Sequence, residues 1–163
     1  KNKSEFNIQD TIDKVINLLN SQFISNGIKI IKSGNDIKIN TFENELIQVI
    51  INLLNNSRDE LIKKDSKDEK LIFIGVTEDK KNLVLEIKDN AGGISEDIID
   101  RVFEPYFTTK YQSQGTGIGL YMSNQIIAGM EGFISVLNEE FEFEGKTYNG
   151  AVFKITIPLV MKI

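Results

Sequence analysis

A long amphipathic helix over residues 42–62 is the sequence feature that most constrains the fold of this chain. Its apolar residues recur at helical spacing and form one stripe: Phe42, Leu46, Val49, Ile50, Leu53, Leu54 and Leu61. The pattern predicts Thr41 as the N-cap and an end near Ile62. Because a helix with one apolar face must bury it against another layer, the rest of the chain has to supply that layer.

Short apolar runs separated by turn signals supply strands on both sides of this helix. Strands are expected at residues 5–7, 28–31, 37–39, 71–77, 83–88, 133–138, 141–143 and 151–158. Gly34-Asn35 predicts a hairpin turn between the second and third strands. Turns are also expected at Glu78–Asn82 and Glu144–Asn149.

Further helices are interleaved with these strands. Apolar spacing predicts one from Ile8 to beyond Leu19, a short one over 96–102 with Ser95 as N-cap, and one from about Ile118 to Met130. This mixture predicts an α+β fold, with a mixed, mostly antiparallel sheet covered by helices on one face. No repeat or domain boundary is visible, so we expect a single domain over residues 1–163, and the first residue, Lys1, suggests a fragment of a longer protein.

Composition excludes several classes of chemistry. The chain has no cysteine and no histidine, which removes thiolate sites, catalytic triads and histidine metal sites. The net charge of −5 argues against a nucleic-acid-binding surface. No apolar run reaches the length of a membrane span, so no membrane contact by this domain is expected.

Polar residues form a second stripe on the long helix, beside the apolar one. Gln48, Asn52, Asn56 and Asp59 share this stripe, and the side chains of Asn52 and Asn56 are neighbours. One interpretation is a solvated helix edge in an asparagine-rich protein. The other is an oxygen ligand for Mg²⁺, an ion that is often held jointly by a few protein oxygens, waters and substrate phosphates.

A glycine-containing segment, Asp89–Ile94, directly follows a predicted strand. The carboxylate of Asp89 can accept a hydrogen bond from an exocyclic amine, and the small residues after it let backbone approach a flat ring. The alternative is an ordinary type I turn with glycine at its exit.

A second glycine-rich segment, Gly115–Leu120, runs straight into a predicted helix. Free backbone N–H groups and the positive end of a helix together bind phosphate. Between the two glycine segments lies Phe103–Lys110, whose aromatics can pin a mobile loop and whose Lys110 is a candidate phosphate contact. An aromatic loop anchor with a solvated lysine is the alternative.

In order and spacing, these segments resemble the catalytic and ATP-binding domain of bacterial sensor histidine kinases, within the superfamily that includes gyrase, mismatch-repair and heat-shock chaperone ATPases. The N box is similar to Gln48–Asp59, the first glycine box to Asp89–Ile94, the F box to Val102–Lys110 and the second glycine box to Gly115–Leu120. The resemblance covers nearly the whole chain. It implies a two-layer α/β sandwich (the Bergerat fold) with a mobile ATP lid over about residues 99–116.

The resemblance also implies a role for each matching residue. Asn56 would coordinate Mg²⁺, Asp89 would accept from the adenine amino group, and Phe103 would anchor the lid. Gly93 and Ile94 would line the base. The implied ATP-binding set is Asn52, Asn56, Asp59, Asp89, Ala91, Gly93, Ile94, Phe103, Lys110, Gly115, Thr116, Gly117, Ile118, Gly119 and Leu120. Two positions depart from the family: Ala91 replaces a common glycine, and Asp59 stands where many kinases carry a basic residue.

Asn52 bears on the reaction. The superfamily's ATPases place a water-activating glutamate at this position, and a neutral amide cannot act as a general base. The resemblance therefore implies ATP-dependent phosphoryl transfer to a histidine on a separate dimerisation domain, which this chain lacks, with a response regulator downstream and a cytoplasmic location. A superfamily ATPase, an anti-sigma-type serine kinase and a catalytically silent nucleotide-binding module are the alternatives.

Overall fold

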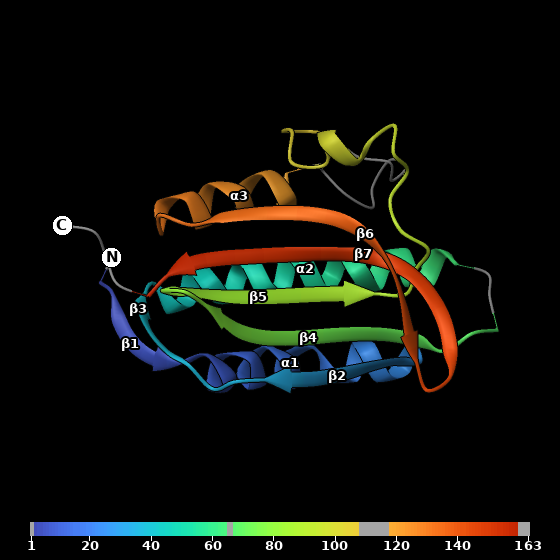
Figure 1. The fold of residues 1–163 in the computed structure, drawn as a ribbon, viewed down its shortest axis with the longest axis horizontal. Helices are drawn as coiled ribbons and strands as arrows, with labels where there is room; N and C mark the ends of the chain where they lie inside the picture. The colour runs from blue at the N-terminus through green and yellow to red at the C-terminus, as the bar shows by residue number, and fades with distance from the viewer. Residues whose placement is uncertain (1, 65–66, 108–117, 160–163) are drawn as a thin grey trace.

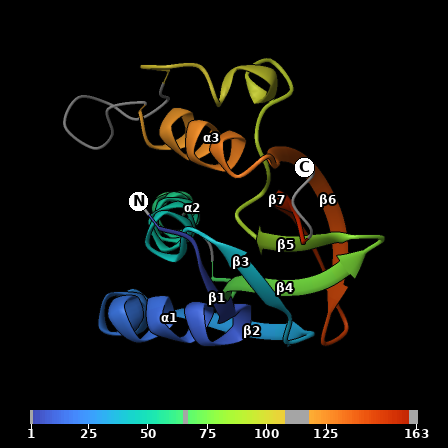
Figure 2. The same ribbon diagram turned by 90° about the vertical axis from the view of Figure 1, so that its left-hand side faces the viewer.

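The computed structural model describes residues 2–64, 67–107 and 118–159, and these residues form two layers (Figure 1). One layer is a five-stranded sheet. The other consists of helices α1 (Ile8–Ser25), α2 (Glu43–Lys63) and α3 (Gly119–Gly129), which cover one face of that sheet (Figure 2). The expected α/β sandwich, with its helices on one face, is confirmed.

The sheet is mixed and mostly antiparallel, as predicted. Its strands are β2 (Ile28–Gly34), β4 (Lys70–Asp79), β5 (Asn82–Asp89), β7 (Lys146–Pro158) and β6 (Phe133–Phe143), in that spatial order. Only the β2–β4 pair is parallel, and the other pairs in this sheet are antiparallel. Outside it, β1 (Ser4–Asn7) and β3 (Lys38–Thr41) form a small antiparallel pair.

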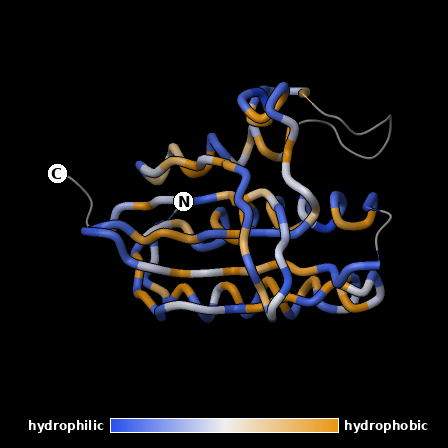
Figure 3. Tube along the Cα trace, turned by 45° about the vertical axis from the view of Figure 1, so that its right-hand side comes forward, coloured by the Kyte–Doolittle hydropathy of each residue, from blue (hydrophilic) through white to orange (hydrophobic). Residues whose placement is uncertain are grey.

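The core lies between the sheet and the helices, as the alternating hydropathy of the strands indicates (Figure 3). Every second residue of the inner strands points into it, including Ile72, Ile74 and Val76 of β4. The predicted stripe on α2 meets them, and Leu53 and Leu54 are fully buried. Each such side chain contributes roughly 2 kcal/mol by leaving water.

The predicted hairpin at Gly34-Asn35 is wrong. β2 pairs with β4, whereas β3 pairs with β1. Gly34 instead allows the backbone of β2 to lie close to β4. A Cβ on Gly34, whose φ is +99°, would lie 2.0 Å from the carbonyl oxygen of Val76. The Asn35 N–H donates to the same carbonyl at 2.9 Å.

The predicted start of α2 is also wrong. Thr41 is the last residue of β3, paired with Ser4, and Phe42 occupies the N-cap position without a side-chain cap. The predicted helix over 96–102 is reduced to a 3₁₀ turn, η1 (Ile99–Arg101). Its N-cap position is Ile98, so the predicted cap at Ser95 is wrong. The Ser95 carbonyl instead accepts from the N–H groups of Ile98 and Ile99, at 3.0 Å each, in the bend before this turn.

The β6–β7 hairpin is longer and tighter than expected. The two strands predicted at 133–138 and 141–143 are one continuous strand, and the turn is confined to Glu144 and Gly145. The far half of the hairpin bends across the helix-free face of the sheet (Figure 1). There Phe141 packs edge-on against Phe73 of β4, with ring centroids 5.5 Å apart.

Candidate functional site

The polar stripe of α2 faces α3. Gln48 donates to the Asn52 amide oxygen at 3.0 Å, and the Asn52 amide nitrogen donates to the Ser123 hydroxyl at 3.1 Å and to the Gly119 carbonyl at 3.4 Å. Asn52 therefore joins α2 to the first turns of α3. Sequence reasoning missed Ser123, a fully buried residue one turn into α3.

Asn56 and Asp59 lie further along the same helix. The Asn56 side chain is half-buried and makes no hydrogen bond among the residues that the structure describes. Asp59 is held differently, because its carboxylate accepts from the Arg58 guanidinium at 3.0 and 3.2 Å. Arg58 also donates to Gln22 of α1 at 2.7 Å, so this pair ties α2 to α1.

Asp89 lies at the end of β5 and is buried. Its Oδ1 accepts from the backbone N–H groups of Ala91 at 3.0 Å and Ala151 at 3.4 Å. Gly150 permits this arrangement, since a Cβ there would lie 1.6 Å from the Asp89 carbonyl oxygen. The carboxylate is thus fixed by two strands and the first residues of the loop.

Burial raises the pKa of Asp89 above its ordinary value, and the two backbone N–H groups offset this only in part. The nearby Ser57 hydroxyl of α2 lowers the pKa of Asp89 as well. This hydroxyl makes no hydrogen bond of ordinary geometry within the described residues. Ser57 therefore places the Asp89 carboxylate close to α2, the helix that also carries Asn56.

The loop after Asp89 is anchored on both sides. Gly92 and Gly93 adopt φ of +100° and +89°, which favours glycine, and the Gly92 N–H donates to the Asn149 carbonyl of β7 at 2.9 Å. Asn138 of β6 hydrogen-bonds the backbone of Ile94. Sequence reasoning did not identify Asn138 as part of the site.

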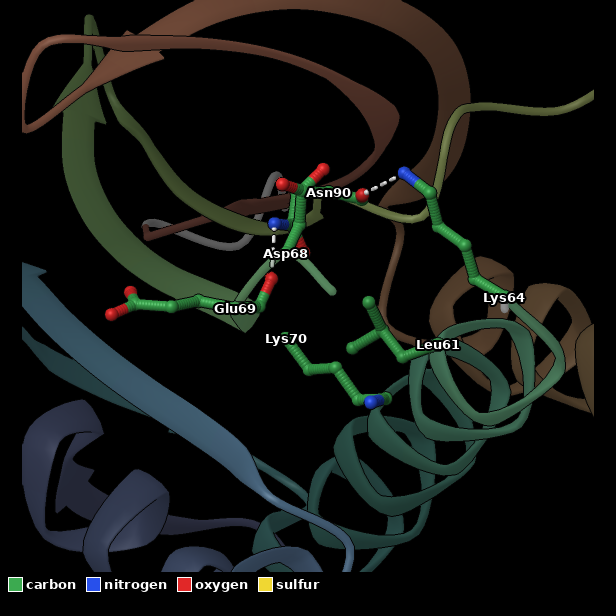
Figure 4. A pocket seen from close by; sticks show the side chains of 6 residues that line it. All are labelled: Leu61, Lys64, Asp68, Glu69, Lys70 and Asn90. Carbon is green, nitrogen blue, oxygen red and sulfur yellow. Dashed lines mark hydrogen bonds between the residues drawn. The ribbon is translucent and has the colours of Figure 1, made fainter. Parts of the chain in front are cut away.

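Asn90 anchors the loop toward β4 (Figure 4). Its buried side-chain amide accepts from the Leu71 N–H at 2.9 Å and donates to the Glu69 backbone carbonyl at 2.7 Å. The Lys64 ammonium donates to the backbone carbonyl of Asn90 at 3.1 Å. A small pocket opens beside these groups, lined by Leu61, Lys64, Asp68, Glu69, Lys70 and Asn90. None of the predicted nucleotide contacts lines it.

The described part of the F box is anchored by Phe103. Its ring packs against the core and meets Phe153 of β7 edge-on, with centroids 6.2 Å apart. Beyond it, the guanidinium of Arg101 lies 4.6 Å from the ring centroid of Phe107. This supports the expected anchoring role of Phe103.

The second glycine box is described only at its end. The predicted contacts Lys110, Gly115, Thr116 and Gly117 lie outside the described residues, as does the second half of the predicted lid, residues 108–116. Ile118 directly precedes α3, and Gly119 and Leu120 open it. The first N–H groups of a helix have no partners within the helix and are suited to anions.

The mixed five-stranded sheet, covered on one face by helices, has the architecture of the Bergerat fold. The model of one family matches residues 41–161. The chain belongs to this family, which is described as histidine kinase-, DNA gyrase B-, and HSP90-like ATPase.

Relatives in sequence are sensor kinases. Sporulation kinase A of Bacillus subtilis is 34% identical over 158 residues, which cover 96% of this chain and 24% of that protein. Sporulation kinase E of the same organism is 37% identical over 155 residues, covering 93% and 19%. The chain therefore spans about a quarter or less of the length of these two relatives.

Solved structures agree in fold. The nucleotide-free catalytic domain of the histidine kinase ThkA aligns with a TM-score of 0.77 and 25% identity, covering 98% of this chain and 97% of that one. Full-length ShkA in complex with AMPPNP aligns with a TM-score of 0.78 and 20% identity, covering 98% and 32%. In the part of the chain that the structure describes, no helix combines the length and apolarity of a membrane span.

Proposed function

We propose that this chain is the ATP- and Mg²⁺-binding catalytic domain of a sensor histidine kinase, which transfers the γ-phosphoryl group of ATP to a histidine on a separate dimerisation domain. One observation carries the proposal: the buried Asp89 lies close to Ser57, the residue that follows Asn56 on α2. The proposed base acceptor and the proposed metal ligand therefore come from two elements that meet. The chain itself contains no histidine.

The adenine base would bind at Asp89. Both backbone N–H groups bind its Oδ1, which leaves Oδ2 to accept from the exocyclic amine. Ala91, Gly93 and Ile94 would line the ring. The left-handed conformation of Gly93 supports this, because it lets backbone approach the ring plane.

The phosphates would extend from the base toward α2 and α3. The Asn56 amide oxygen, which is unengaged among the described residues, suits Mg²⁺, and the N–H groups of Gly119 and Leu120 suit phosphate oxygens. When bound, Mg²⁺ neutralises charge on the phosphates. Lys110 and Gly117 remain proposed phosphate contacts on the strength of the sequence.

The hydrogen bonds of Asn52 favour transfer over hydrolysis. Its side-chain amide accepts from Gln48 and donates to Ser123, so both its oxygen and its nitrogen already bind other side chains of the protein. A neutral, fully bonded amide cannot take a proton from water. Transfer to a supplied histidine needs positioning and charge neutralisation more than a base. The dimerisation domain, a downstream response regulator and a cytoplasmic location complete the proposal.

Two measurements test it. Calorimetry should detect binding of Mg-ATP, and the same sample should release little phosphate. A histidine-bearing dimerisation domain of the parent kinase, added in trans, should then gain an acid-labile phosphoryl group. Sustained phosphate release without an acceptor would favour an ATPase, and an acid-stable serine phosphate on an offered protein would favour a serine kinase. Binding without any transfer would indicate a silent module.

A further inference from the structure

The geometry points to Asn138 as a positioning residue for the base side of the nucleotide pocket. This inference rests on the proposed function, because it takes Gly93 and Ile94 as the backbone that lines adenine. Asn138 lies on β6, 44 residues further along the chain than Ile94, and it would not touch the nucleotide itself. It would act by fixing the loop that does.

Both ends of the Asn138 amide engage the backbone of Ile94. Its Oδ1 accepts from the Ile94 N–H at 2.8 Å, and its Nδ2 donates to the Ile94 carbonyl at 2.6 Å. The same Nδ2 also donates to the Glu96 carboxylate at 3.4 Å. A side-chain amide that pairs with an N–H and a carbonyl in this way imitates a neighbouring β-strand. The loop is therefore held as though it were one further strand beside β6.

Gly93 is shaped to this contact. A Cβ at position 93 would lie 2.8 Å from Oδ1 of Asn138, so the asparagine occupies the space that a side chain there would need. The loop receives a second anchor from the Asn149 carbonyl, which binds the Gly92 N–H. The β6–β7 hairpin thus hydrogen-bonds the loop on both sides of Gly93, at Gly92 and at Ile94. Among the described residues, Asn138 supplies the side-chain hydrogen bonds to the backbone of Ile94.

Fixing this loop in advance lowers the entropic cost of binding the base. Asn138 is exposed, so its truncation removes both hydrogen bonds to Ile94 and the longer one to Glu96 without opening the core. The effect should fall on the base and spare the phosphates, because the proposed phosphate contacts lie on α3 and in the second glycine box. A residue that merely stabilised the fold would weaken both parts of the ligand equally.

The test compares Asn138→Ala with Thr147→Ala, in which an exposed residue of the same hairpin is truncated. Calorimetry would measure two probes, Mg-ATP and Mg-tripolyphosphate, which lacks the base. We expect Asn138→Ala to weaken ATP binding roughly tenfold, the order of loss for one or two exposed hydrogen bonds, and to leave tripolyphosphate binding unchanged. Thr147→Ala should change the affinity for neither probe.

Hydrogen exchange at the Ile94 amide gives a readout that does not depend on nucleotide. The amide should exchange faster in Asn138→Ala than in the unsubstituted chain. In Asn138→Asp, which keeps the acceptor and loses the donor, the exchange rate should be intermediate. This second variant serves if the alanine variant fails to fold. Unchanged ATP affinity, or an equal loss for both probes, would overturn the positioning role. Absence of ATP binding in the unsubstituted chain would instead overturn the proposed function.

Discussion

The Asn52 amide donates to the Ser123 hydroxyl at 3.1 Å and to the Gly119 carbonyl at 3.4 Å, which joins the helix of the proposed magnesium ligand to the helix of the proposed phosphate contacts. Asn56 lies one turn along α2 from this contact. The separation between metal and phosphate sites is therefore set by a direct contact between two rigid elements and does not depend on the loop between them.

The contact between these helices can be measured with a double-mutant cycle. Asn52→Ala and Ser123→Ala should each destabilise the chain, and the double variant should lose less than the sum, with a coupling of about 1 kcal/mol. Urea unfolding gives the three free energies. Asn17→Ala, an exposed asparagine of α1, is the matched control and should add independently to Ser123→Ala. Full additivity for Asn52 would contradict the contact.

Asp89→Asn should abolish most base recognition. It places an amide donor opposite the adenine amine, and we expect a loss of roughly 10- to 100-fold in ATP affinity, as for a hydrogen bond to a charged group. Asp79→Asn, an exposed residue at the opposite end of the β4–β5 hairpin, should bind ATP normally. Equal affinity of the Asp89 variant and the unsubstituted chain, measured by calorimetry, would refute the assignment.

The same carboxylate should make the stability of the free chain depend on pH. Burial holds the pKa of Asp89 above its ordinary value, so the folded chain binds this proton more readily than the unfolded chain. The favourable contribution is fully present below the ordinary pKa and is lost as pH rises through the raised one. Thermal melts between about pH 3 and pH 7 should show the unsubstituted chain losing stability relative to Asp89→Asn. Parallel melting curves would contradict the shift.

Asn56→Ala should weaken the part of nucleotide binding that depends on magnesium. Removing the amide oxygen takes away the one protein ligand proposed for Mg²⁺, so titrations with and without the ion should differ less in the variant than in the unsubstituted chain. Binding of ATP in excess chelator should be unaffected. Asn17→Ala again supplies the control, and an unchanged effect of magnesium in Asn56→Ala would exclude this role.

Gly150→Ala tests the close approach of β7 to the end of β5. A Cβ at this position would lie 1.6 Å from the Asp89 carbonyl oxygen, so the strands must separate, at a cost of about 3 kcal/mol or more. Gly129→Ala, at the end of α3, meets nothing within 4 Å and should change stability by less than about 1 kcal/mol. Denaturant unfolding distinguishes the two, and similar values would argue against the packing described.

The periodicity of apolar residues predicted the two layers well. Helix α2 and the inner strands each bury one face, and apolar residues recur along the sequence at the spacing of that face. Pairing was harder to predict. The chain does turn at Gly34-Asn35, as the residue types predict. The strand that pairs with β2 is nevertheless β4 and not the next strand along the chain. The pair Glu139-Glu140 reads as an interruption between two strands, yet β6 continues through it as an edge strand, where polar residues are tolerated.

The site divides in the same way. Asp89, Gly93 and Asn56 could be proposed from the sequence because each lies in a short contiguous segment whose residue types suggest a function. Their roles stay predictions. Ser123 and Asn138 were missed because each acts on a residue far away in the chain, 71 positions for Ser123 and 44 for Asn138. Serine inside a helix and asparagine inside a strand carry no signal of their own. Only the fold shows what they bind.

The partners of the Asp89 carboxylate have a consequence for how this site can vary. Both hydrogen bonds that fix Oδ1 come from main-chain groups, those of Ala91 and Ala151. Replacing either alanine by any residue other than proline would leave those N–H groups in place. Side chains at these positions, and with them the shape and polarity of the proposed pocket, can therefore change. The orientation of the Asp89 carboxylate is kept, because backbone groups fix it.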